Sequence, residues 1–234
     1  MIALYRKELR STFTSWTGYV YLAVFSLISG FIFTTGNLMS QNGDIKSYFA
    51  SICTVLVLLV PILTMRVFAE ERKLRTLQLL FTMPLSLGDI VAGKFLATLT
   101  VFCIGLVPTL AYPVILSSYG SVEVAVIAGN YVGLLMLVSA CIAIGLFVSA
   151  LTENQLIAAV VTYALLLALW LLDTTGLVSA AGNGTGLLSY LSLNRHFLPF
   201  TYGVFDPADI VFFASLTLLF LAFCVLTLDA RQSA

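Results

Sequence analysis

Residues 70–94 read EERKLRTLQLLFTMPLSLGDIVAGK, and this stretch decides the fold. It holds four of the eleven basic residues of the chain and three of its eleven acidic residues. Long apolar runs with almost no charge flank it on both sides. A charged, periodic segment between such runs is typical of a cytoplasmic connection between two membrane spans. It is also where we expect a soluble partner to dock.

The composition supports a membrane protein. The chain has 234 residues, of which 60% are hydrophobic and only 9% are charged, whereas soluble domains carry about 25% charged residues. A surface so poor in charge would not stay in water, so we predict an all-α integral membrane protein. This composition argues against a soluble enzyme, and the net charge of zero argues against a nucleic-acid partner.

Six apolar runs have about the 20 residues that a bilayer requires. We predict transmembrane helices at residues 18–35, 48–68, 95–116, 124–151, 156–172 and 210–228. An interfacial helix is expected in residues 1–16, as an amphipathic helix to Arg10 followed by a polar link at 11–16. The long connection at residues 173–209 contains short apolar pieces, 176–181 and 187–193, that predict short outer helices. A disordered loop is the alternative.

Basic residues predict the orientation, because they concentrate in cytoplasmic loops. With the N-terminus inside, nine basic residues lie on the cytoplasmic side and only Lys46 and Arg195 lie outside. Both termini are therefore expected to be cytoplasmic. None of the charged residues is expected in the middle of a span, so an ion relay through the chain is not predicted.

Within the central stretch, Leu74, Leu77 and Phe81 repeat at the spacing of one helix face. Pro84 ends this predicted helix, and Ser86 can cap the next helix with Asp89 three residues later. The stretch thus reads as helix, break, helix. Such a helix can lie along the membrane and offer its polar side to a soluble domain, and an inert linker is the alternative.

The sequence contains no G-x-x-x-x-G-K-[ST] phosphate loop, so the chain is not expected to hydrolyse ATP by that mechanism. The sole histidine, His196, lies near Asp206 and Asp209 in the outer segment. These residues suit a weak metal site or an enzyme site, but solvated or structural roles are more common for such a group. We predict no catalytic, cofactor-binding or metal-binding residues.

The stretch 70–86, together with Gly93-Lys94, resembles the signature E-E-[RK]-x-x-G-T-L-E-x-L-L-x-x-P-x-S…G-K of type-2 ATP-binding-cassette (ABC) permeases. Arg75 replaces the glycine of that signature and Gln78 replaces its second glutamate. The first change suggests a regular helix at this point, stiffened by a Glu71–Arg75 pair. The second argues against any salt bridge that the family makes from that position.

The resemblance extends over the whole chain and is closest to the gliding-motility and nitrous-oxide-reductase-maturation branch. Residues 7–10 (KELR), 18–20 (GYV) and the pattern LS…HF…F…GVFD…D within 191–209 carry it. It implies a single permease domain, residues 1–234, in a bacterial cytoplasmic (inner) membrane, with residues 69–94 as the segment coupled to an ATPase. It also implies a second permease, identical or paralogous, and two copies of a cytosolic ABC ATPase that bind ATP and Mg.

The resemblance implies that the chain couples ATP hydrolysis by its partner to export. The expected coupling residues are Glu70, Glu71, Arg72, Arg75, Thr76, Leu77, Gln78 and Pro84. Polar side chains within spans are candidates for a transport path or for helix–helix hydrogen bonds, namely Asn130, Tyr131 and Thr162. A mechanotransmitter that moves no substrate and acts on an outer periplasmic or extracellular partner is the alternative. Such a partner would contact Arg195, His196 and Asp206.

Overall fold

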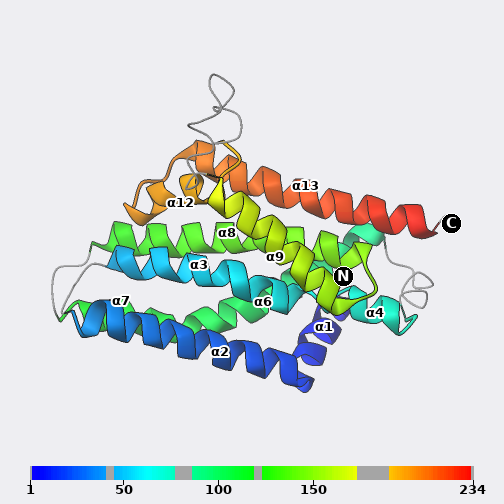
Figure 1. The fold of residues 1–234 in the computed structure, drawn as a ribbon, viewed down its shortest axis with the longest axis horizontal. Coiled ribbons are helices and arrows are strands. Elements are labelled where there is room, and N and C mark those ends of the chain that lie inside the picture. Colours follow the sequence, from blue (N-terminus) through cyan, green and yellow to red (C-terminus); the bar gives the residue numbers. More distant parts are fainter. Residues whose placement is uncertain (1, 41–44, 77–85, 119–122, 173–189, 233–234) are drawn as a thin grey trace.

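The computed structural model describes residues 2–40, 45–76, 86–118, 123–172 and 190–232, and these residues form helices and turns without a strand. The long helices run roughly side by side in an elongated bundle (Figure 1). The helical elements and their bounds are α1 (Ile2–Thr14), α2 (Trp16–Phe33), a π-helical turn (Thr34–Leu38), α3 (Ile45–Thr64), α4 (Ala69–Lys73), α6 (Leu87–Leu106), a 3-10 turn (Val107–Leu110), α7 (Ala111–Leu116), α8 (Val124–Leu151), α9 (Gln155–Leu171), α12 (Leu193–Thr201) and α13 (Pro207–Gln232).

Among the described residues, five helical stretches are long and apolar enough to cross a membrane. They are Trp16–Leu38, Ile45–Lys73, Leu87–Leu116, Val124–Leu151 and Pro207–Ala230. A multi-pass, all-helical membrane protein is therefore confirmed. The remaining predicted span, residues 156–172, corresponds to α9, whose 17 residues make it a shorter apolar helix. The six-span arrangement therefore stays a prediction.

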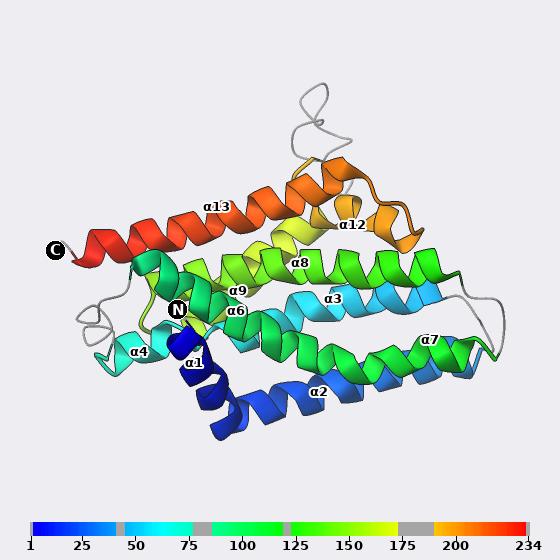
Figure 2. The same cartoon turned by 180° about the vertical axis from the view of Figure 1, so that it is seen from behind.

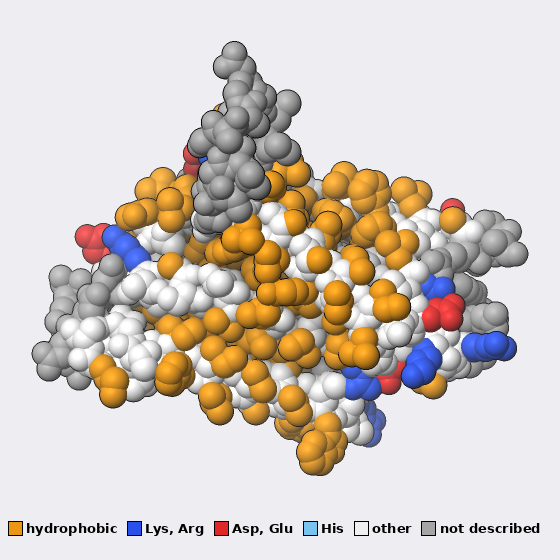
Figure 3. Space-filling model, in the orientation of Figure 1, with side chains coloured by type: hydrophobic (Ala, Val, Ile, Leu, Met, Phe, Trp, Pro, Cys, Tyr) orange, Lys and Arg blue, Asp and Glu red, His pale blue; other side chains and the backbone are white. Residues whose placement is uncertain are grey.

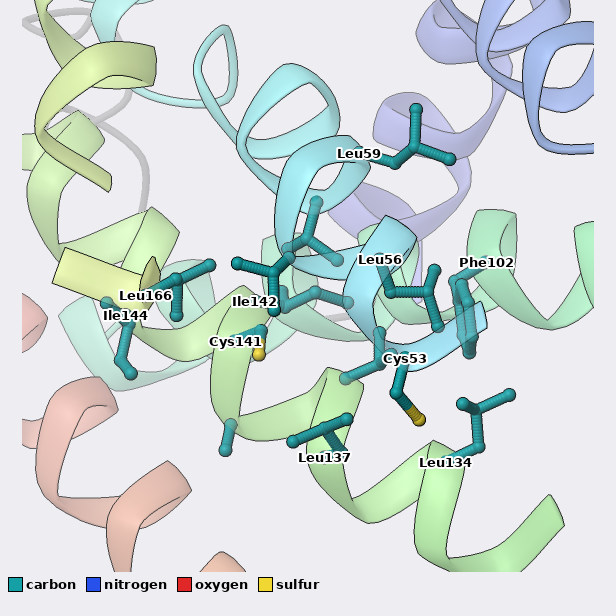
Figure 4. Packing of buried hydrophobic residues seen from close by; sticks show 14 of the residues in the cluster. Cys53, Leu56, Leu59, Phe102, Leu134, Leu137, Cys141, Ile142, Ile144 and Leu166 are labelled. Atoms are coloured by element: carbon teal, nitrogen blue, oxygen red, sulfur yellow. The ribbon is translucent and has the colours of Figure 1, made fainter. Parts of the chain in front are cut away.

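Helix α8 lies at the centre of the bundle and packs against α3, α9, α12 and α13. In the most apolar part of α8, 72% of the residues are buried, compared with 11% in the most apolar part of α13. In the close view of Figure 4, Cys53 of α3 lies beside Leu134 and Leu137 of α8, and Leu166 of α9 closes the cluster on another side. Buried apolar side chains of α3, α8 and α9 therefore belong to one continuous core.

The N-terminal helix α1 lies at one end of the bundle, at a steep angle to the long helices (Figure 2). It packs on α6 and α2, with Leu4 buried and the Tyr5 hydroxyl 3.1 Å from Oγ1 of Thr100. Residues 11–14, which we predicted as a polar link, instead continue the helix. The Thr12 and Thr14 hydroxyls donate to carbonyls one turn back, so these polar side chains are compatible with helical backbone.

The inner helix that we predicted as continuous from its apolar periodicity is interrupted at Arg75. Helix α4 stops at Lys73, and Arg75 has a φ of 56°. The amide of Thr76 donates to the carbonyl of Glu71 and that of Arg75 to the carbonyl of Arg72. This is the Schellman pattern, which places a left-handed residue just past a helix, usually glycine. The prediction of a regular helix at Arg75 is therefore wrong, because the left-handed turn persists without the glycine.

The second half of the central stretch begins as predicted. The Ser86 hydroxyl accepts a hydrogen bond from the amide of Asp89 at 3.1 Å and caps α6. Helix α6 therefore begins at Leu87, eight residues before the predicted span, and Lys94 lies two turns inside it. The remaining predicted features of the stretch, from Leu77 to Pro84, lie outside the described residues.

Charged side chains gather at one end of the molecule, and hydrophobic side chains cover the visible face of the bundle (Figure 3). This charged end contains α1, α4 and the turn at residues 152–154, and both chain termini lie there (Figure 1). The opposite end holds α7 and α12. Helix α12 begins at Leu193, where the second predicted outer helix was expected to end, and residues 176–181 lie outside the described part.

Candidate functional site

Several segments far apart in the sequence meet at the charged end. The turn after α3 leads into α4, and both lie against the start of α6, the end of α8 and the middle of α1. Hydrogen bonds and ion pairs between polar side chains and backbone groups join these segments. The arrangement brings the first half of the predicted coupling segment against three other helices.

Lys94 is the centre of this arrangement, and its side chain is 0% exposed. Its Nζ lies 2.9 Å from Oε1 of Glu71 and 3.2 Å from Oε1 of Glu8. It also donates to the carbonyl of Val67 at 3.0 Å, so the three donors of the ammonium group have three acceptors. The ring of Phe68 lies 5.1 Å away, a cation–π distance. We call Glu8, Glu71 and Lys94 the Lys94 cluster.

The Lys94 cluster connects three elements at one point, because Glu8 lies on α1, Glu71 on α4 and Lys94 on α6. A buried charge is costly unless it is paired. Removal of one member of the cluster would therefore leave a buried charge without compensation. The cluster therefore fixes the relative positions of these three helices. Among the described residues, Oε2 of Glu71 is buried without a hydrogen-bond partner.

Lys94 directly precedes the predicted third span, and the early start of α6 places it inside the packed bundle. One expectation about this region is wrong. Glu71 was expected to pair with Arg75 along a continuous helix. The helix ends between them and Arg75 turns into left-handed backbone, so Glu71 pairs with Lys94 instead.

Helix α4 is also held against α8. The Ser149 hydroxyl accepts hydrogen bonds from the amides of Phe68 and Ala69, each at 3.1 Å, and donates to the carbonyl of Met65. These amides belong to the turn and first residue of α4, where a helix leaves its first amides without partners of its own. Ser149 of α8 thus supplies hydrogen-bond partners for backbone groups that are left unpaired between the end of α3 and the start of α4.

Arg72 makes the second connection from α4 to α8. Its guanidinium donates to the carbonyl of Ala150 at 3.1 Å and lies 2.9 Å from Oε1 of Glu153. The arginine side chain is 14% exposed, whereas that of Glu153 is 68% exposed, so the bond to the carbonyl is the better shielded of the two. Glu71 and Arg72 therefore tie neighbouring positions of α4 to two different helices.

The other predicted coupling residues differ in their surroundings. Glu70 pairs with Arg66 through two contacts of 2.8 Å, one helical turn apart. Arg75 and Thr76 are exposed at the end of α4. Leu77, Gln78 and Pro84 lie outside the described residues. The structure thus brings Glu71 and Arg72 into the site and leaves Glu70, Arg75 and Thr76 at its edge.

The three candidates for a transport path are dispersed through the bundle. Asn130 is buried and donates to the carbonyls of Val126 and Thr201. The Tyr131 hydroxyl donates to the carbonyl of Thr109 at 2.8 Å. Thr162 is buried, and its hydroxyl has no partner within the described residues. Hydrogen bonds to other segments thus occupy the Tyr131 hydroxyl and the amide nitrogen of Asn130. The side-chain oxygen of Asn130 is buried without a partner among the described residues.

The predicted outer contacts lie at the end of the bundle opposite the Lys94 cluster. His196 Nδ1 is 2.6 Å from Oδ1 of Asp209, and its Nε2 is 2.9 Å from the carbonyl of Tyr190. Asp206 is exposed and accepts a hydrogen bond from the amide of Ala208, and Arg195 stacks on the ring of Tyr190. No group of three metal-ligating side chains occurs in the described residues, and both ring nitrogens of His196 are already engaged.

The predictions from sequence did not include the partners of the coupling segment. Glu8 and Lys94 were noted only in motifs, and Ser149 and Glu153 were not singled out at all. The available signal was their place at the ends of apolar runs, where a polar residue either faces water or pairs with another helix. These residues lie up to about 80 positions from α4 in the sequence. The sequence alone therefore does not show whether they face water or pair with α4.

A family model described as "ABC-2 family transporter protein" matches residues 2–227, almost the entire chain. The matched range includes the Lys94 cluster, Ser149 and helix α12. No curated protein matches the sequence.

Proposed function

Because the chain belongs to the ABC-2 family of transporter proteins, we propose that it is the membrane permease subunit of an ATP-driven exporter. In this proposal a separate cytosolic ATPase binds ATP and Mg and supplies the energy, and the chain itself carries no catalytic site or cofactor. The chain changes the access of a substrate path between itself and a second permease, identical or paralogous.

The Lys94 cluster is the observation that carries the proposal. A force on α4 reaches α6 and α1 through Glu71, Lys94 and Glu8, and it reaches α8 through Arg72. Buried ion pairs have narrow geometric tolerance, so these helices respond to α4 as a unit. A lever for a soluble ATPase requires such a connection between an exposed segment and the membrane-spanning helices.

We further propose that the charged end faces the cytoplasm of a bacterium, so that both termini and α4 are on the side of the ATPase. The excess of basic residues in the corresponding connections, nine against two, supports this orientation. Helix α9 is the fifth of six spans in this scheme. Its 17 residues reach about 25 Å at the helical rise of 1.5 Å per residue, so α9 would need local thinning of the bilayer.

The experiment is co-expression of the chain with an ABC ATPase encoded beside it, followed by purification in mild detergent and measurement of ATP turnover in proteoliposomes. We expect a stable complex with two ATPase copies. The Glu71→Gln variant keeps the Lys94–Glu8 pair, and we expect it to bind the ATPase but to lose most of its substrate-dependent ATP turnover. Glu123→Gln, which changes an exposed carboxylate at the other end of α8 and outside these contacts, is the matched control. Failure of the unmodified chain to bind any ABC ATPase would overturn the proposal.

The predicted inner helix offers a second test of coupling. We expect bulky charged residues in place of Leu77 and Gln78 to weaken co-purification with the ATPase, because both belong to the stretch that resembles the family's coupling segment. Unchanged binding and ATP turnover in this double variant would remove that stretch from the docking surface.

A mechanotransmitter, as in the gliding-motility and nitrous-oxide-reductase-maturation branch that the sequence resembles, is a second candidate. The packing of α12 favours it, because His196 pairs with Asp209 of α13 and Phe200 packs closely on α8. Movement of α8 or α13 would therefore reach exposed Arg195 at the opposite end of the bundle. ATP-dependent binding of an outer partner without substrate movement would select this candidate, and substrate-stimulated ATP turnover with vesicle transport would select export.

A further inference from the structure

A shallow, open basic groove lies along the exposed side of α1 and is lined by residues of α1 and Ser15. Its polar lining consists of Arg6, Lys7, Arg10, Ser11, Thr14 and Ser15. We propose that this groove binds the phosphate group of an anionic phospholipid and so anchors α1 to the surface of the membrane. The proposal concerns a site separate from the Lys94 cluster and does not depend on which partner drives the chain.

The charges of the groove are uncompensated within the described part of the chain. Arg6, Lys7 and Arg10 are all exposed, and no carboxylate lies within ion-pair distance of them among the described residues. The nearest acidic residue in sequence, Glu8, is directed to the opposite side of the helix by its contact with Lys94. One face of α1 is therefore purely basic, while the other is fixed to the bundle.

The position of the three cations suits one phosphate group. Residues three and four apart lie on the same face of a helix, so Arg6 and Arg10 lie one above the other, with Lys7 beside them. Guanidinium groups match phosphate oxygens with paired hydrogen bonds, and an ammonium group adds a point charge. The exposed Ser11 hydroxyl has no partner in the described residues and supplies a further donor.

Apolar side chains beside the groove favour a lipid over a free phosphate or an acidic protein. Ile2 is 71% exposed, Trp16 is 86% exposed and Tyr19 is 61% exposed. Trp16 follows Ser15 of the groove directly and begins α2. Exposed aromatic residues at the start of a spanning helix are typical of the interface between headgroups and acyl chains. The groove thus presents cations to a headgroup and apolar side chains to the adjacent acyl region.

The test uses the fluorescence of Trp16, which is the better exposed of the two tryptophans of the chain. The full chain carrying Trp170→Phe is placed in phosphatidylcholine nanodiscs that contain increasing fractions of brominated phosphatidylglycerol. We expect quenching to saturate at a low fraction of the anionic lipid and to weaken at high salt. In the Arg6→Gln/Lys7→Gln/Arg10→Gln variant, the half-saturating fraction should rise at least about fivefold, the effect of one basic residue near an anionic surface.

The matched control is Lys73→Gln/Arg75→Gln/Arg195→Gln, which removes three exposed cations outside the groove. It should leave the half-saturating fraction unchanged. Circular dichroism of both variants checks that the helices are retained. Inorganic phosphate should not relieve the quenching, and relief would show a free-phosphate site instead. The proposal is overturned by quenching that only follows the bulk lipid fraction, or by equal saturation in the two triple variants. It is also overturned if the groove variant keeps its lipid preference and loses binding to the ATPase.

Discussion

The two ends of the bundle are held together by different forces. At the charged end, the Lys94 cluster joins three helices through buried ion pairs. At the opposite end, α12 lies on α8 because glycines leave room for it: a Cβ at Gly129 would lie 2.7 Å from the carbonyl oxygen of Phe200, and one at Gly133 would lie 2.6 Å from Cβ of Phe200.

The contact at the charged end is directional, because it consists of ion pairs, whereas the contact at the α12 end is close packing of helix against helix. An ion pair transmits displacement between particular atoms and fails when one partner is removed. A glycine contact tolerates no added atoms and resists compression. The charged end is therefore suited to receiving a force, and the α12 end to carrying it as a rigid body. The first four predictions below test this contrast through thermal unfolding in detergent.

The largest effect is expected for Lys94→Met. The change leaves the carboxylates of Glu8 and Glu71 in a largely buried site without their cation, at a cost of about 3–5 kcal/mol. Lys73→Met, at an exposed lysine of α4, is the control and should be nearly neutral. A small effect of Lys94→Met would mean that water or rearrangement compensates the carboxylates, and the charged end would then not be a rigid connection.

At the opposite end, Gly129→Ala should destabilise the fold by up to about 3 kcal/mol, because the new methyl group meets the backbone of residues 200 and 203. Gly36→Ala is the matched control, since a Cβ there meets nothing within 4 Å. Equal stability of the two variants would show that α12 is not seated closely on α8.

Ser149→Ala should cost about 2 kcal/mol, since the amides of Phe68 and Ala69 would lose their acceptor in a buried site. Ser51→Ala is the comparison, because the exposed Ser51 hydroxyl donates to the carbonyl of Ser47 within its own helix, α3. If both alanine variants unfold alike, the break between α3 and α4 does not depend on α8.

The smallest effect has the opposite sign. Arg75→Gly should stabilise the chain by about 1 kcal/mol, because left-handed backbone is costly for a residue with a Cβ. The midpoint of thermal unfolding should rise by about 2–4 °C for a chain of this size. Arg75→Ala keeps the Cβ and serves as the control, with no comparable gain expected. A fall in the midpoint with glycine would show that the arginine side chain itself stabilises the turn.

Much of the fold could be predicted because it depends on local patterns. Apolar runs located the long helices, and the spacing of Ser86 and Asp89 predicted the cap of α6 correctly. Arg75 was misread because a left-handed turn depends on the competition between helix and cap, which the residue type alone does not reveal. The site was less predictable: Lys94 finds its carboxylates only after three helices have packed, and no local pattern encodes that pairing.

We propose that α1, α4 and α6 move as one unit when the partner ATPase binds ATP. Double electron–electron resonance measures it most directly, with spin labels at Ser11 of α1 and Lys73 of α4 in a variant without the four native cysteines. We predict that ATP leaves this distance unchanged in the complex with the ATPase, and that Glu71→Gln allows it to change. A distance that changes with ATP in the chain with an intact Lys94 cluster would contradict the account.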